Sequence, residues 1–108
     1  MHASVDFIKQ LELEYLRILS KEIRSGTISA EVAQASARYF LKLLPFSSYN
    51  DITIKIEKFA TEYTQFTHLF TFVKQQEQEV KTQIVLERMR KLMKENKITE
   101  AIAAAQTT

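Results

Sequence analysis

The scarcity of turn-forming residues is the feature that most constrains this chain, because its 108 residues include one glycine, Gly26, and one proline, Pro45. A β-rich fold needs many tight turns, and tight turns draw on Gly and Pro. Hydrophobic residues make up 45% and charged residues 26%, which is the balance of a folded chain and not of a disordered one. We therefore predict a single all-α domain over residues 1–108, with four to five helices.

Capping residues predict where the first three helices begin and end. Ser4, Ser29 and Ser48 each precede a helical pattern, and a serine there can accept hydrogen bonds from the free N–H groups of the first turn. Gly26 stands where a helix end needs a residue that is comfortable at positive φ. Pro45 disfavours helix at the residue before it, so the second helix should end near residue 44.

The apolar pattern of the second helix predicts which of its side chains are buried. Its predicted buried stripe consists of Ala33, Ala37, Phe40, Leu41 and Leu44, with Val32, Tyr39 and Leu43 beside it.

The segment 52–56 has a pattern that is also typical of a strand. It reads Ile-Thr-Ile-Lys-Ile, which alternates strictly and is rich in β-branched residues. No second strand is available to pair with it, and an isolated strand leaves its backbone groups unmatched. Ile52, Ile56 and Phe59 also fit helical spacing, so we predict a helix that leaves Ile54 outside its apolar face.

Residues 66–96 contain neither Gly nor Pro, which predicts a long fourth helix. Its apolar side changes, however, since the apolar residues beyond Ile84 centre roughly 130° around the helix from those before it. The polar segment 74–79 lies between the two sets. Either the helix breaks near residues 75–83, or its second half packs on something different. Both alternatives predict an irregular helical bundle, with a body over about 4–74 and a C-terminal helical hairpin over about 78–106.

The hairpin turn repeats the pattern of the turn at Gly26. Asn96 tolerates positive φ, and Thr99, three residues later, could cap the last helix. That helix is short and would be marginal alone. We expect Ile98 and Ile102 to fold back onto the end of the fourth helix.

Apolar residues in the hairpin are the candidates for partner binding. So short a last helix cannot cover all of them, and methionines adapt to irregular surfaces and recur in helix-binding grooves. The alternative is that they only make the contact within the hairpin. The predicted partner-binding residues are Val85, Leu86, Met89, Leu92 and Met93.

Basic residues in the same region suggest an alternative function, weak binding of nucleic acid or of an anionic membrane surface. The candidate anion-binding residues are Arg88, Arg90, Lys91, Lys94 and Lys97. They are spread around the helix, and cations near a helix C-terminus also offset its dipole without any ligand. A net charge of +2 is too small to imply a polyanionic partner.

Catalysis is poorly supported by the sequence. The chain has no cysteine, and of its two histidines, His2 and His68, the second has no acidic residue at the three- or four-residue spacing of helical metal motifs. Glu12 projects into the apolar half of the first helix. A carboxylate there is a functional group, or lies at the mouth of the core, or pairs with a cation from a neighbouring helix. We predict a chain that is not an enzyme and that binds no metal or cofactor.

The sequence shows neither a membrane-spanning segment nor a secretory signal, and the expected localisation follows from this. No apolar run approaches the 20 or so residues that cross a bilayer, and the N-terminus lacks the basic and apolar stretches of a secretory signal. We expect a soluble, cytoplasmic, helical module for protein–protein interaction or assembly, which either binds a protein partner or self-associates.

Overall fold

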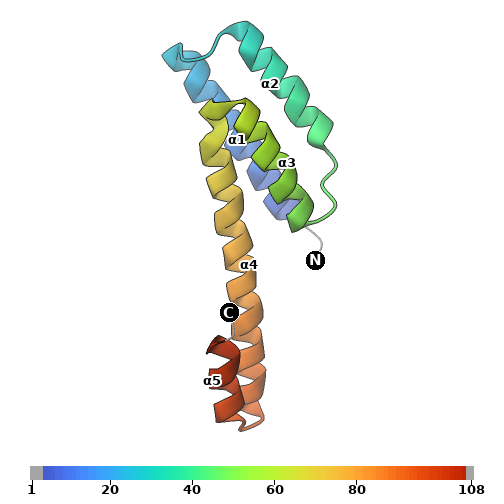
Figure 1. Cartoon of the computed structure of the whole chain (residues 1–108), viewed down its shortest axis with the longest axis vertical. Helices are drawn as coiled ribbons and strands as arrows, with labels where there is room; N and C mark the ends of the chain where they lie inside the picture. Colours follow the sequence, from blue (N-terminus) through green and yellow to red (C-terminus); the bar gives the residue numbers. More distant parts are fainter. Residues whose placement is uncertain (1–3, 107–108) are drawn as a thin grey trace. The chain divides into compact units, whose positions relative to one another are not determined.

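The structure is a computed structural model that describes residues 4–106, and these residues form helices joined by short turns, with no strand among them (Figure 1). The elements in chain order are α1 (Val5–Ser25), α2 (Ala30–Leu43), α3 (Tyr49–Glu62), a short 3-10 helix (Thr64–Phe66), α4 (Thr67–Lys94) and α5 (Ile98–Gln106). The prediction of an all-α fold is confirmed.

The chain folds as two compact units, the first ending at Lys74 and the second beginning at Gln75. The first holds α1, α2, α3, the 3-10 helix and the start of α4, and the second holds the rest of α4 together with α5. Helix α4 is continuous from Thr67 to Lys94. Of the two predicted alternatives, the break near residues 75–83 is therefore wrong, and the long helix is confirmed.

The predicted caps begin the first three helices. The hydroxyls of Ser4, Ser29 and Ser48 each accept a hydrogen bond from the backbone N–H three residues later, at 3.0, 3.2 and 3.1 Å. Gly26 follows the last residue of α1 with a φ of 75°, in the left-handed region that favours glycine. Local chemistry thus sets these helix boundaries.

Helix α3 resolves the ambiguity of the alternating segment. Ile52, Ile56 and Phe59 are fully buried on one side of the helix, and Ile54 is exposed, as predicted. Helical spacing prevails because a helix pairs its own backbone groups, whereas a strand here would have had no neighbour.

Helix α2 buries a stripe that overlaps the predicted one, because Ala33 and Phe40 are buried as predicted. Ser36 is completely buried and Leu41 is 65% exposed, so the predicted burial of Leu41 is wrong. The Phe40 ring stacks on the Tyr15 ring of α1, with 4.3 Å between centroids. The stacking turns the side of α2 that carries Ser36 toward the core. There the Ser36 hydroxyl shares a hydrogen bond with the Tyr15 hydroxyl at 2.9 Å and donates another to the Ala33 carbonyl at 2.9 Å.

Aromatic rings make up the centre of the first unit's core. Phe59 has no exposed surface, and its ring centroid lies 5.3 to 5.9 Å from those of five other rings. These rings belong to Tyr15, Tyr39, Phe40, Tyr63 and Phe66. All eleven Phe and Tyr residues of the chain precede residue 75, so the second unit has no aromatic side chain.

Burial of Tyr15 makes the stability of the first unit sensitive to alkaline pH. Burial raises the pKa of the Tyr15 phenol above 10.0, although its hydrogen bond with Ser36 partly opposes the shift. The folded state therefore favours the neutral phenol, and this contribution is complete below about pH 10 and is lost as the pH rises through the folded-state pKa. We expect urea unfolding between pH 8 and pH 11 to show a steeper loss of stability for the wild type than for Tyr15→Phe; parallel pH profiles would contradict this.

Candidate functional site

The second unit is a helical hairpin in which α5 runs back along the last part of α4 (Figure 1). Asn96 has a φ of 61°, which confirms the predicted positive-φ position. The Lys97 N–H closes the turn by donating to the Leu92 carbonyl at 2.8 Å. Helix α5 then begins at Ile98, so Thr99 lies within its first turn, and its predicted role as a cap is wrong.

Alanines form the buried side of α5. Ala101 and Ala104 are buried, whereas Ile98 and Ile102 are 51% and 54% exposed. The two isoleucines, which were expected to fold back onto the end of α4, thus keep about half of their side-chain surface exposed. Small side chains let helices approach closely, and a row of alanines three residues apart is the sequence signal that marks this side of α5.

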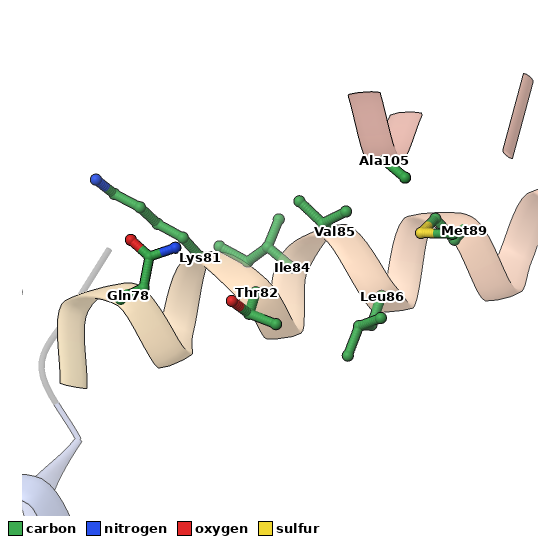
Figure 2. A pocket seen from close by; sticks show the side chains of 8 residues that line it. All are labelled: Gln78, Lys81, Thr82, Ile84, Val85, Leu86, Met89 and Ala105. Carbon is green, nitrogen blue, oxygen red and sulfur yellow. The ribbon is translucent and has the colours of Figure 1, made fainter. Parts of the chain in front are cut away.

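The five predicted partner-binding residues fall into two groups. Val85, Met89 and Leu92 are more than half covered, whereas Leu86 is 50% exposed and Met93 is 52% exposed. Figure 2 shows Val85 projecting to the side of α4 on which Ala105 of α5 lies, whereas Leu86 projects away from it. Helix α5 thus shields only one side of the apolar set.

The exposed members of both helices lie on the same side of the hairpin. At about 100° per residue, Leu86 and Met93 are displaced roughly a quarter-turn from the side of α4 that carries Val85, Met89 and Leu92. Ile98 and Ile102 are displaced by a similar angle, in the same sense, from the buried alanines of α5. Because both helices are right-handed and run in opposite directions, equal senses of displacement place all four side chains on one side of the hairpin. We call these four residues, Leu86, Met93, Ile98 and Ile102, the open apolar face.

A groove of about 570 Å³ adjoins the open apolar face, next to the last turn of α5 (Figure 2). It contains three predicted partner-binding residues, and the apolar side chain of Ile84, which is half exposed, also lines it. The full lining is Gln78, Lys81, Thr82, Ile84, Val85, Leu86, Met89 and Ala105.

The five candidate anion-binding residues are all exposed. Lys97 pairs with Glu95 at 3.4 Å. By the same angular count, Arg90 is displaced toward the side of the open apolar face, Lys94 lies on the side of α4 opposite α5, and Arg88 and Lys91 are displaced toward the other side. No single basic stripe is available to follow a nucleic-acid backbone.

The remaining candidates do not assemble into a catalytic or metal-binding group. Glu12 is half-buried and lines a small groove of about 260 Å³ with Leu16 and Leu41. The Nε2 of His68 lies 3.9 Å from the Glu14 carboxylate of α1, while His2 falls outside the described residues. Across residues 4–106, no three or more His, Cys, Asp or Glu side chains gather in a way that could hold a metal ion. No helix in this range is long and apolar enough to span a membrane.

The open apolar face therefore stands as the strongest candidate site, and it is judged on geometry alone. The chain matches no family model, no curated protein and no solved structure.

Proposed function

We propose that this chain is a small, non-catalytic helical module for protein–protein interaction or assembly, which binds through the open apolar face of its C-terminal hairpin. The observation that carries the proposal is the exposure of four large apolar side chains on one side of the hairpin that α4 and α5 form. Single exposed apolar residues are ordinary on protein surfaces, but a contiguous group of them is characteristic of binding sites.

The architecture of the hairpin gives the physical reason. An amphipathic helix must cover its apolar stripe with another layer, and two helices can cover only the sides that face each other. Here alanines make the inner contact of α5, which leaves Ile98 and Ile102 outside. Complete burial of such a side chain is worth about 1.5–3 kcal/mol, so four half-exposed ones retain about 4 kcal/mol of unused burial. A partner that covers them recovers this free energy.

Charge substitutions on the open apolar face test the proposal. We expect wild type either to self-associate in light scattering or to bind a labelled, uncharged amphipathic helical peptide in fluorescence anisotropy. Leu86→Glu with Met93→Glu should weaken that association by about tenfold or more, because it introduces carboxylates into the interface.

Val5→Glu with Leu13→Glu is the matched control. It also places two carboxylates at exposed apolar positions, on α1 in the first unit, and should change the association by less than about twofold. Circular dichroism of both variants would verify that the helices are retained. A wild-type chain that stays monomeric and ignores the peptide, or equal losses in both double variants, would refute the proposal.

A further inference from the structure

A second apolar surface lies in the first unit, between α1 and α2. It is the small groove of about 260 Å³ that Glu12 lines, and we call it the α1–α2 groove. Leu16 and Leu41, which are 53% and 65% exposed, belong to its lining, and Glu12 is the only charged residue among those of residues 4–106 that line it. The full lining is Glu12, Tyr15, Leu16, Ala37, Phe40, Leu41 and Leu44.

The Glu12 carboxylate favours an occupant that brings a cation. It is half-buried in a mainly apolar lining and takes part in no ion pair within residues 4–106. Lys9, one turn earlier on α1, is turned about 60° further from α2 than Glu12 is. A carboxylate that has lost part of its hydration and has no partner gains from a cation that covers it.

The open apolar face of the hairpin carries such a cation. Arg90 lies between Leu86 and Met93 along α4, is displaced toward the same side, and takes part in no ion pair in the part of the chain that the structure describes. Glu87, one turn earlier, is turned about 60° toward the side opposite α5. Glu79, on the same side as Leu86, lies about 16 Å before Arg90 along the helix.

The two surfaces match when α4 of one copy lies antiparallel on α1 of another. With Arg90 opposite Glu12, Leu86 lies opposite Leu16, because Leu86 is four residues before the arginine and Leu16 is four residues after the glutamate. One register therefore pairs the charges and covers the exposed leucines of both helices.

The same placement lays α5 on α2. Leu16 is displaced about 100° from Tyr15, whose ring stacks on Phe40 of α2. Leu86 is displaced by the same angle and in the same sense from Val85, which projects to the side of α5 (Figure 2). Both helix pairs are antiparallel (Figure 1) and share this handedness, so a hairpin that faces the groove with α4 antiparallel to α1 has α5 over α2.

The exposed isoleucines of α5 then meet leucines of α2. Ile98 and Ile102 lie about one helical turn apart, and so do Leu41 and Leu44 of the α1–α2 groove. Both rows of the open apolar face thus find an apolar counterpart on a second copy.

From these observations we infer that the open apolar face of one copy docks in the α1–α2 groove of a second copy, with Arg90 of one chain paired to Glu12 of the other. This inference rests on the proposed function and specifies the partner as the same chain. Each copy offers both surfaces, so the contact is heterologous and the assembly can extend beyond a dimer.

A neighbouring groove between α2 and α3 also holds carboxylates but fits less well. Its lining is Tyr39, Ile54, Glu57, Lys58, Thr61 and Glu62. Ile54 is the one branched aliphatic side chain in this lining, so most of the open apolar face would find no counterpart there. Lys58 would also oppose the charge of Arg90.

Charge reversals in the full chain test the pairing. Sedimentation velocity over a range of concentrations gives the concentration at which half of the chains are associated. We expect Glu12→Arg and Arg90→Glu each to raise this concentration about tenfold or more, because each reversal brings like charges together. The double variant Glu12→Arg with Arg90→Glu restores an opposite pair and should return the concentration to within about threefold of the wild-type value.

Two single variants with the same charge changes are the matched controls. Glu57→Arg lies in the groove between α2 and α3, and Arg88→Glu lies on the other side of α4, and each should change the association by less than about twofold. Circular dichroism would verify that all variants keep their helices. Val5 and Leu13 are not among the residues that line the α1–α2 groove, so the control for the proposed function is unaffected.

Three results would overturn the inference. They are a wild type that stays monomeric at every concentration, a double variant whose loss is the sum of the two single losses, and equal losses in the control variants. If the wild type is monomeric but binds the uncharged helical peptide, and Leu86→Glu with Met93→Glu abolishes that binding, the proposed function stands and only the second copy is wrong. If the chain neither self-associates nor binds the peptide, both proposals fail.

Discussion

Replacement of Phe59 by alanine is expected to lower the free energy of unfolding of the first unit by about 3–5 kcal/mol. The Phe59 side chain of α3 has no exposed surface and touches rings from α1, α2 and the 3-10 helix, as well as the ring of Tyr63, the residue that follows α3. Its removal leaves a cavity that four separate elements would have to collapse to fill, so relaxation can recover little of the loss. Because domains of this kind have only about 5–15 kcal/mol of stability, this single change removes a large part of it.

Ile54→Ala on the same helix is the matched control, because Ile54 is 47% exposed and the change should cost less than about 1 kcal/mol. Urea unfolding followed by tyrosine fluorescence measures both variants. All four tyrosines precede residue 75, so this signal reports the first unit specifically. Similar losses for the two variants would show that the aromatic cluster is not the centre of the core.

Replacement of Ser36 by alanine is expected to cost about 1–3 kcal/mol, although it removes only one oxygen atom. The Ser36 hydroxyl is completely buried and shares a hydrogen bond with the Tyr15 hydroxyl, at 2.9 Å. Without the Ser36 hydroxyl, the buried Tyr15 hydroxyl loses its hydrogen-bond partner, and water does not easily reach it to replace that bond. An unsatisfied buried hydroxyl lowers the free energy of unfolding by the full cost of its desolvation.

A double-mutant cycle separates this penalty from simple loss of packing. Tyr15→Phe combined with Ser36→Ala removes both polar partners, so we expect the double variant to be clearly more stable than the sum of the two single losses predicts. The same urea titrations measure the cycle, with circular dichroism as the signal because Tyr15→Phe alters the fluorescence. Additive losses would mean that the hydroxyl pair makes no specific contribution.

The candidate site was only partly predictable from the sequence. Leu86 and Met93 are among the predicted partner-binding residues, and both are half exposed in the hairpin. Their separation from Val85, Met89 and Leu92 depends on which side of α4 receives α5. Ile98 and Ile102 were expected to fold back onto the end of α4. They instead extend the exposed surface of the hairpin, because Ala101 and Ala104 are the buried residues of α5.

Helix positions were determined by the sequence itself, because their causes lie within a few residues. A serine hydroxyl three residues from the N–H that it binds, a glycine at positive φ and a proline without an N–H each act locally, and Ser4, Gly26 and Pro45 accordingly stand at helix ends in the structure. Only the tertiary structure decided which side of each helix is covered. Ser36 is buried because a tyrosine from another helix reaches it, and Ile98 is exposed because neighbouring alanines pack more closely. Hydrophobic burial has no direction of its own, so a broad apolar pattern permits several helix orientations, and the shapes and hydrogen bonds of the partners select one.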